Sequence, residues 1–263
     1  MKHAFAMLVI VASLAACATT TSSTGRTQYV GAVSQEQLNQ LGAQAFTEAK
    51  QKGPLSTNSG QNAYVRCVVN ALVQQLPGDQ RAMAWESAVF AVDEPNAYAL
   101  PGGKVGINTG LFKVAKDQDQ LAAVVAHEIG HVVERHHDER ITRQMGAAGA
   151  VQLLGAVAGD YGQLATQGGS MLAQTGFLLP GSRVQETEAD VVGQRMMAQA
   201  GFDPRAAVGL WQNMIAAGGS RPPQWLSTHP DPQSRISELQ ARATQLVPTY
   251  EQARAAGRRP ACR

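Results

Sequence analysis

Two histidines and a glutamate in the stretch AVVAHEIGHVV have the spacing of a catalytic metal site. On a helix that turns about 100° per residue, His127 and His131 project from one face about 40° apart, with Glu128 about 60° from His131. The pattern H-E-x-x-H thus presents two nitrogen ligands and a carboxylate beside an open metal position. An amphipathic helix with a polar face is the alternative, but the preceding run LAAVVA predicts a buried helix, and buried histidines need partners. We therefore expect a metal site here.

A catalytic zinc needs a third protein ligand, with water in the fourth position. The candidates are the carboxylates of SRVQETEAD, residues 182–190, and His229. Glu186 and Asp190 are one helical turn apart and face the same way, so we expect Glu186 to bind the metal. Asp190 would then accept a hydrogen bond from the far nitrogen of a ligand histidine. Glu188 lies about 200° around the helix from Glu186, and we expect it to be a solvated carboxylate.

Two further histidines follow the motif directly. Continued helical geometry places His136 opposite His127, and His137 about 80° away from His127. We expect both to be structural or surface residues rather than ligands.

Three motifs, H-E-I-G-H, S-R-x-x-E-x-x-A-D and THPDPQSRI, occur in an order that resembles the M48 family of zinc metallopeptidases. The resemblance covers roughly residues 38–239 and is greatest with periplasmic lipoprotein members that lack membrane spans. It implies a zincin-like (gluzincin) domain with one Zn²⁺ per chain, held by His127, His131 and Glu186. It also implies that Glu128 is the general base.

The same resemblance implies roles for three residues around the metal. Asp190 would contact a ligand residue on the side away from the metal. Arg235 would hold its own segment in place or bind a carboxylate near the site. His229 would donate a hydrogen bond to the transition state, or act as an extra zinc ligand in a latent state. The alternative for His229 is a solvent-exposed position at the start of a helix.

The stretch NAYALPGGKVGINTGLF, residues 96–112, is similar to the family's strand segment ahead of the metal helix. An extended substrate could add as a strand at this edge, with backbone pairing for binding and pockets for preference. The alternative is that the hairpin only connects its neighbours. The expected edge residues are Asn96, Ala97, Tyr98, Gly103 and Val105.

Local patterns predict an α+β fold, mostly helical, with one small β-sheet. Residues 85–93 are the best strand candidate, and Ser34, Asp117 and Ser182 are predicted helix N-caps. We expect one peptidase domain over residues 29–246 and a C-terminal tail over 247–263. Within the domain, the glycine-rich and nearly uncharged residues 146–181 are either a mobile loop or lid near the site or a connector.

Composition excludes one class of partner. The chain has 263 residues, 44% of them apolar and 16% charged, and a formal net charge of +2. These values fit one globular domain with a core and give no basic field for nucleic acid, which we therefore exclude as a partner.

The N-terminus resembles a bacterial lipoprotein precursor. Residues 1–16 contain a short apolar run typical of a secretory signal, and LAAC resembles a lipobox that ends at Cys17. We expect cleavage before Cys17, lipid on Cys17 and a flexible tether over residues 17–28; a plain signal peptide is the alternative. Ala18 follows the cysteine, and by analogy this favours the outer membrane, facing the periplasm.

The two remaining cysteines, Cys67 and Cys262, could form one disulfide in an oxidising periplasm. Two free thiols are the alternative.

These observations predict a zinc endopeptidase that hydrolyses unfolded or misassembled envelope polypeptides. The alternative is a periplasmic chaperone or assembly factor whose proteolysis is latent. A peptidoglycan hydrolase fits the compartment but not H-E-x-x-H with a distant glutamate.

Overall fold

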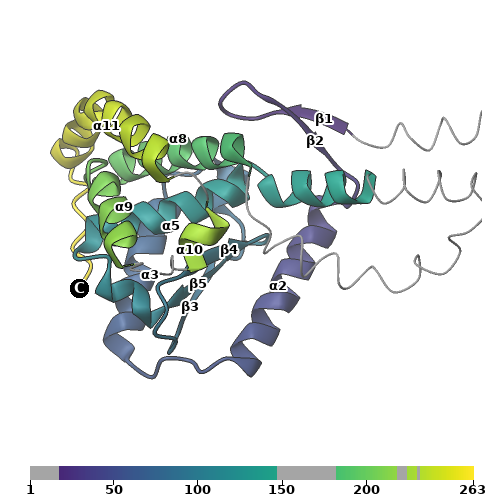
Figure 1. Ribbon diagram of the computed structural model, residues 1–263, viewed down its shortest axis with the longest axis horizontal. Coiled ribbons are helices and arrows are strands. Elements are labelled where there is room, and N and C mark those ends of the chain that lie inside the picture. The colour runs from purple at the N-terminus through teal and green to yellow at the C-terminus, as the bar shows by residue number, and fades with distance from the viewer. Residues whose placement is uncertain (1–17, 147–181, 218–223, 230–231) are drawn as a thin grey trace, which may run out of the picture.

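The computed structural model describes residues 18–146, 182–217, 224–229 and 232–263 (Figure 1). The predicted signal peptide, Cys17 and the predicted loop or lid, except Gly146, lie outside the described residues. The described helices are α2 (Gln35–Lys52), α3 (Ser59–Val73), α4 (Gly78–Arg81), η2 (Thr109–Lys113, 3-10), α5 (Gln118–Val133), α8 (Arg183–Ala200), α9 (Ala206–Ala217), α10 (Gln224–Thr228) and α11 (Pro232–Ala255), with residues 136–146 also helical. The strands are β1 (Ala18–Thr21), β2 (Thr27–Val30), β3 (Glu86–Phe90), β4 (Ala97–Leu100) and β5 (Lys104–Asn108). The predicted α+β, mostly helical class is confirmed.

The three-stranded sheet lies between α2 and the helix pair α3 and α5 (Figure 1). Its strand order is β3-β5-β4, with β5 parallel to β3 and antiparallel to β4. Side chains alternate across a strand, so each face carries its own set. One face packs Phe90 and Leu100 against Phe46 of α2. The other face joins the main core under α3 and α5 through Val89, Ala97, Ala99, Val105 and Ile107.

Polar caps start the helices where the sequence predicts them. The side chains of Ser34 and Ser182 each accept from a backbone N–H three residues on, and Gln37 and Gln185 complete both capping boxes. Asp117 caps α5 in the same way. Each such cap stabilises its helix by about 1 kcal/mol. The caps at Asp117 and Ser182 therefore help to fix the starts of the two helices that carry the candidate site.

Two glycines let α5 and α8 cross closely. A Cβ on Gly130 would lie 3.0 Å from the carbonyl oxygen of Ala189, and one on Gly193 would lie 3.0 Å from the backbone nitrogen of His127. Glycine inside a helix costs roughly 0.5–1 kcal/mol relative to alanine. At this crossing the two glycines let the helices approach, so that Glu186 and Asp190 of α8 reach His127 on α5.

The predicted tether over residues 17–28 is wrong for its described part, because the chain forms a β-hairpin there. β1 and β2 pair antiparallel, with Ala18 opposite Val30 and Thr21 opposite Thr27. Threonine-rich sequence suits a strand, and polar side chains between the strands bind carboxylates of the domain. The described residues therefore hold two small sheets, where the sequence predicted one.

The predicted boundary at residue 246 is also not seen. α11 continues to Ala255 with Pro248 inside it, and Ala253 is buried. Beyond the helix, a disulfide joins Cys262 to Cys67 on α3. The C-terminal residues thus belong to the domain, because buried apolar contacts and a covalent bond hold them.

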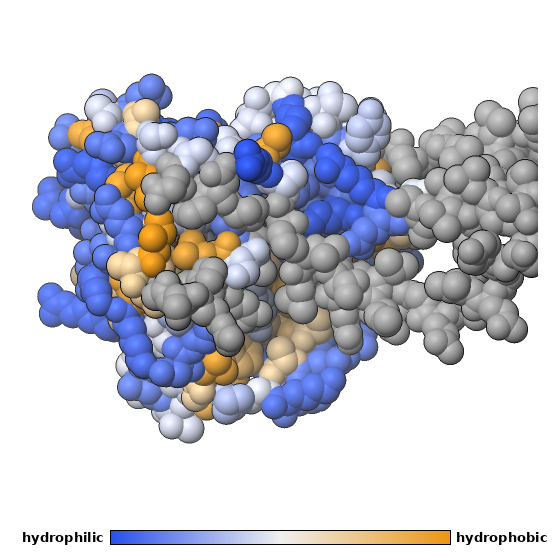
Figure 2. Space-filling view, in the orientation of Figure 1, coloured by the Kyte–Doolittle hydropathy of each residue, from blue (hydrophilic) through white to orange (hydrophobic). Residues whose placement is uncertain are grey.

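Over the described residues, every helix is too short or too polar to cross a lipid bilayer. On the face shown in Figure 2, hydrophilic surface covers most of the described outer parts, and hydrophobic residues gather mainly toward the left centre.

Candidate metal centre

Three segments far apart in the sequence bring one group of side chains together. His127 and His131 come from α5, Glu186 from α8, and His229 follows α10. One potential ligand atom from each of these four residues lies within 4.8 Å of the others, and all four residues are buried. The structure thus places the three predicted ligands and the further candidate His229 side by side.

The ligand atoms face one another across short distances. His127 Nε2 lies 3.1 Å from His131 Nε2 and 3.3 Å from Glu186 Oε2, and His131 Nε2 lies 3.6 Å from Glu186 Oε1. Glu186 Oε1 is buried, and no described residue forms a hydrogen bond with it. A buried acceptor of this kind is costly unless something fills its lone pairs. A metal ion between these atoms would do so, and the residues therefore fit a metal.

Asp190 and Arg235 form a buried layer behind His127. Asp190 Oδ1 lies 2.9 Å from His127 Nδ1. Arg235 donates from Nε and Nη2 to the two oxygens of Asp190, both at 2.7 Å, and from Nη1 to Glu186 Oε2 at 2.9 Å. The guanidinium also stacks over the ring of Trp211 at 4.0 Å. Arg235 therefore contacts two carboxylates at once.

These contacts determine the charges at the site. Burial raises the pKa of the Asp190 carboxyl, but Arg235 and His127 together hold that pKa well below its usual range. Burial raises the pKa of Glu186 too, and His229 and His127 lower it by more. Burial disfavours charge on His127, yet its hydrogen bonds to Asp190 and Glu186 raise its pKa to about 9. A metal ion entering the site would therefore displace a proton from His127.

His131 has the opposite electrostatics. Burial, with the neighbouring His127 second, lowers the pKa of His131 well below its usual value. The ring is therefore neutral, which leaves one nitrogen with a lone pair for a metal.

Glu128 lies beside the ligands and is held by an aromatic residue. The Nε1–H of Trp225, on α10, donates to Glu128 Oε1 at 2.8 Å. His229 Nε2 lies 3.4 Å from the same oxygen, and His229 Nδ1 is 2.9 Å from the Trp225 carbonyl. Trp225 is not among the site residues predicted from the sequence. The signal for it is its spacing of four from His229, which puts both residues on one side of a short helix.

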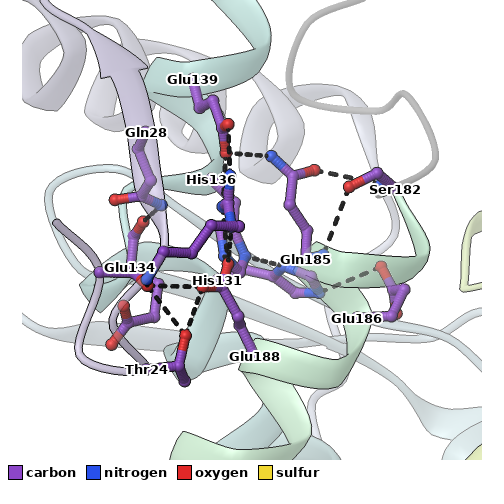
Figure 3. A network of polar contacts seen from close by, with 12 residues as sticks. Thr24, Gln28, His131, Glu134, His136, Glu139, Ser182, Gln185, Glu186 and Glu188 are labelled. Atoms are coloured by element: carbon purple, nitrogen blue, oxygen red, sulfur yellow. Dashed lines mark hydrogen bonds and ion pairs between the residues drawn. The ribbon is translucent and has the colours of Figure 1, made fainter. Parts of the chain in front are cut away.

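The expectation for Glu188 is wrong, because its side chain is buried and not solvated. His136 is buried and lies outside the ligand cluster, as expected of a structural residue, but its ring lies next to His131 and not on the opposite side of the helix (Figure 3). His136 Nδ1 lies 2.8 Å from His131 Nδ1, and His136 Nε2 lies 3.1 Å from Glu188 Oε2. The helical wheel failed at His136 because α5 ends at Val133 and Arg135 has a φ of 56°, which turns the chain before residues 136–146 become helical again. It failed at Glu188 because the N-terminal hairpin covers that side of α8.

His137 is structural and buried, and its Nε2 lies 2.9 Å from the carbonyl oxygen of Ala99 on β4. This contact leads to the predicted substrate edge.

The predicted edge residues separate into two groups. Ala97 and Tyr98 lie in β4, which is an edge strand, and Asn96 directly precedes it. Val105 is wrong as an edge residue, because it lies in β5 with strands on both sides. Gly103 is in the turn, with a φ of 76°, and its carbonyl accepts from the Glu86 N–H of β3. Of the five predicted residues, therefore, only Ala97 and Tyr98 lie in an edge strand, with Asn96 directly before it.

A model of one protein family matches residues 59–243, which include every residue of the cluster. The chain belongs to peptidase family M48. Membership of family M48 implies a metal cofactor, which the His and Glu cluster has the chemistry to bind.

Curated relatives agree with this family. The beta-barrel assembly-enhancing protease of Escherichia coli is 30% identical over 243 residues, covering 88% of this chain and 48% of the relative. The mitochondrial metalloendopeptidase OMA1 of Schizosaccharomyces pombe is 42% identical over 160 residues, 60% of this chain and 46% of the relative. The OMA1 of Arabidopsis thaliana is 37% identical over 163 residues, 61% of this chain and 32% of the relative. The M48 chain thus spans about half, or less, of the length of these relatives.

Proposed function

We propose that this chain is a zinc-dependent endopeptidase that hydrolyses peptide bonds of unfolded or misassembled envelope polypeptides. One observation carries the proposal: two histidines and a glutamate with an unpartnered buried oxygen converge directly beside Glu128. The names of the relatives, which are proteases and metalloendopeptidases, support the same reaction class.

Zinc is the metal that the ligand set favours. Two nitrogens each about 2.0–2.1 Å from one tetrahedral zinc would lie roughly 3.3 Å apart. The observed separations between the three ligands are 3.1, 3.3 and 3.6 Å. Zinc held by His127, His131 and Glu186 would supply a Lewis acid that polarises a peptide carbonyl and acidifies water.

Glu128 is the residue that we assign to proton transfer. Trp225 occupies its Oε1, so Oε2 is the oxygen that would take the proton of the attacking water and return it to the leaving amine. His229 Nε2 lies 3.4 Å from Glu128 Oε1, and His229 Nδ1 donates to the Trp225 carbonyl. His229 would therefore donate from Nε2 to the oxyanion of the transition state only as an imidazolium, with both ring nitrogens protonated.

An extended substrate would pair with β4. Asn108 N donates to Asn96 O at 3.0 Å, so Asn96 faces β5, and Ala97 and Ala99 direct their backbone groups the other way. His137 already occupies the Ala99 carbonyl, and Asn96 Oδ1 accepts from the Ala97 N–H at 2.9 Å. We propose that the Ala97 C=O and the Ala99 N–H form the backbone hydrogen bonds with the substrate. A chain that pairs in this way must be unfolded over several residues, which favours unfolded polypeptides.

The compartment is a proposal that rests on the N-terminal sequence. We propose that Cys17 carries lipid and anchors the chain to the outer membrane, facing the periplasm. Labelling with radioactive palmitate checks this, and Cys17→Ser should abolish the label.

The test of the activity compares the wild-type chain with Glu128→Gln. We measure zinc per chain and cleavage of casein, an unfolded protein. We expect one zinc in both chains and a loss of roughly 10²–10⁴-fold in the variant's cleavage rate, since a general base contributes that much. A chain without zinc, or equal cleavage by the two chains, would contradict the proposal.

One observation favours a second function, a chaperone or assembly factor with latent proteolysis. His229 belongs to the buried cluster, and four ligands would close a site that catalysis needs open. The variant His229→Ala distinguishes an active endopeptidase from a chaperone or assembly factor with latent proteolysis. Faster casein cleavage with retained zinc indicates that His229 blocks the site, whereas slower cleavage with retained zinc indicates a transition-state donor.

A further inference from the structure

The far nitrogen of each histidine ligand has its own partner. For His127 the partner is Asp190, a carboxylate 2.9 Å from Nδ1. For His131 it is another imidazole, His136, whose Nδ1 lies 2.8 Å from His131 Nδ1. An imidazole can donate or accept, so this contact alone does not determine which ring nitrogen of His131 carries the proton.

Glu188 decides the direction of that hydrogen bond. Its Oε2 lies 3.1 Å from His136 Nε2, and a carboxylate can only accept, so His136 carries its proton on Nε2 (Figure 3). His136 Nδ1 is then an acceptor, and His131 must donate to it from Nδ1. The Nε2 of His131 is left with a lone pair, and this is the nitrogen that faces His127 and Glu186.

Glu188 is in turn held by the N-terminal hairpin. Its Oε1 accepts from Ser22 Oγ and Thr24 Oγ1, both at 2.6 Å. Its Oε2 accepts from Arg26 Nη2 at 2.6 Å and Nε at 3.0 Å. All these donors lie within five residues at the turn between β1 and β2, and they saturate both oxygens of the carboxylate.

Arg26 also fixes the hairpin to the domain at a second carboxylate. It donates to both oxygens of Glu139, at 2.7 and 2.8 Å, and Gln185 Nε2 donates to Glu139 Oε2 at 2.8 Å. Glu139 is fully buried. On the same side, the Ser23 N–H donates to Glu134 Oε2 at 2.9 Å. The position of Arg26, and so of Glu188, is therefore set by several contacts that do not involve the metal ligands.

We propose that the β1–β2 hairpin is a positioning element of the metal centre, which acts through Arg26, Glu188 and His136 to fix the ring and the tautomer of His131. The inference rests on the proposed function, since it takes His131 as a zinc ligand. None of these three residues contacts the substrate or the metal; each acts through the next.

The experiment uses the full chain purified in detergent. For the wild type, Arg26→Ala, Glu188→Gln and His136→Ala we measure zinc affinity by competition with a chromophoric chelator. In the zinc-free chains, ¹⁵N NMR of the histidine rings reports the tautomer of His131. We expect Glu188→Gln and His136→Ala to weaken zinc binding about 10–100-fold, as loss of a partner of a ligand histidine does. Arg26→Ala should give a smaller loss, and the Nδ1–H tautomer of His131 should lose its dominance in all three.

Arg143→Ala is the matched control. Arg143 Nη2 donates to Glu139 Oε1 at 2.5 Å, like Arg26, but it does not contact Glu188. We expect it to leave the zinc affinity and the tautomer unchanged. Arg26→Lys should restore part of the affinity, because one ammonium can reach Glu188 but cannot serve two carboxylates as a fork. Arg26→Ala and Glu188→Gln combined should weaken binding by less than the product of the two single effects.

Two outcomes would overturn the inference. In the first, the folded variants keep wild-type zinc affinity and the His131 tautomer, and only the free energy of unfolding falls; the hairpin is then merely structural. In the second, the wild type binds no zinc, which overturns the proposed function as well. If Arg26→Ala does not fold, Thr24→Val removes one hydroxyl from Glu188 at nearly constant volume and tests the same path, with zinc affinity and tautomer read as before.

Discussion

At the scale of single residues, the two oxygens of Glu186 have different surroundings. Oε2 accepts from Arg235 and faces His127, whereas Oε1 is buried with no hydrogen bond from any described residue. Arg235 thus orients the carboxylate by one oxygen, and the other oxygen is the one that would be available to a metal. The spacing of Glu186 and Asp190 predicts that the two side chains face the same way, and both do lie within 3.3 Å of His127.

Trp225 should matter for catalysis and not for zinc. Its Nε1–H donates to Glu128 Oε1, and a hydrogen bond to a charged group contributes about 1.5–3 kcal/mol. We expect Trp225→Phe to keep the zinc and to lower the rate of peptide cleavage by about 10- to 100-fold, since each 1.4 kcal/mol is tenfold. Steady-state cleavage of a fluorogenic peptide, with zinc determined on the same samples, checks this. Loss of zinc in parallel with the rate would argue that Trp225 supports the ligands instead.

Glu139 should make the stability of the domain depend on pH. Burial raises the pKa of its carboxyl, but the hydrogen bonds from Arg26 and Gln185 lower it below its usual value. A carboxyl with a lowered pKa in the folded state contributes stability above its unfolded pKa of about 4.3, and that stability is lost as the pH falls. Glu139→Gln should therefore be less stable than the wild type by about 2 kcal/mol at pH 7. The difference should shrink from about pH 5 downward, as urea unfolding between pH 3 and 7 would show. A difference that stays constant over this range would contradict the ionic role.

Two residues whose surroundings the helical wheel does not predict share one property. Glu188 and His136 have partners on the hairpin, far away in the sequence, or across a break in the helix. A helical wheel gives the direction of a side chain within its own helix, and it says nothing about which element covers that direction. His127, His131 and Glu186 were predictable because each lies inside an unbroken helix and their partners face them across one crossing.

At the scale of elements, the crossing of α5 and α8 depends on Gly130. We expect Gly130→Ala to weaken zinc binding about tenfold, because the new Cβ would meet the backbone of Ala189 at 3.0–3.1 Å and push Glu186 away from the histidines. The free energy of unfolding should change by less than about 2 kcal/mol, since overpacking costs about 1–3 kcal/mol and alanine favours a helix by up to about 1 kcal/mol. Chelator competition and urea unfolding measure the two effects.

Gly209→Ala is the control for that substitution. Its Cβ would meet only the Nε2 end of the Gln120 side chain, at 3.1 Å, which can move. It should keep the zinc affinity and gain up to about 1 kcal/mol of stability. Equal zinc affinity in both variants would show that the close crossing does not set the ligand geometry.

Helix starts were the most predictable elements, and the hairpin was the least. Ser34, Asp117 and Ser182 cap helices because the capping partner is three residues away in the sequence. The segment ATTTSSTGRTQ predicts a tether because its residues are small and polar. Its stability comes from Glu134, Glu139 and Glu188, which the sequence does not connect with it.

At the scale of the whole molecule, the disulfide connects residues that are 195 positions apart. It ties the C-terminus to α3, and the nearby Cys262 N–H donates to Gln118 at the start of α5. We expect Cys67→Ser combined with Cys262→Ser to lose about 2–5 kcal/mol of unfolding free energy, as native disulfides of small domains do. Zinc affinity should be retained, since neither cysteine contacts the site.

Urea unfolding with and without dithiothreitol measures this effect. The reductant should destabilise the wild type by the same amount as the double substitution and should leave the variant unchanged. If the reductant reaches the disulfide of the wild type and the free energy of unfolding does not change, the disulfide does not stabilise the domain.

The hairpin has a consequence for the way in which a lipid anchor on Cys17 would hold the domain. A flexible linker of 12 residues would give a lipid anchor at Cys17 a reach of roughly 20 Å, within which the domain could turn freely. β1 begins at Ala18, so an acyl chain on Cys17 would be joined to the folded domain with no slack. The domain would then rest on the bilayer in one orientation, and it would meet only those polypeptides that come to the membrane surface on the side to which β4 is turned.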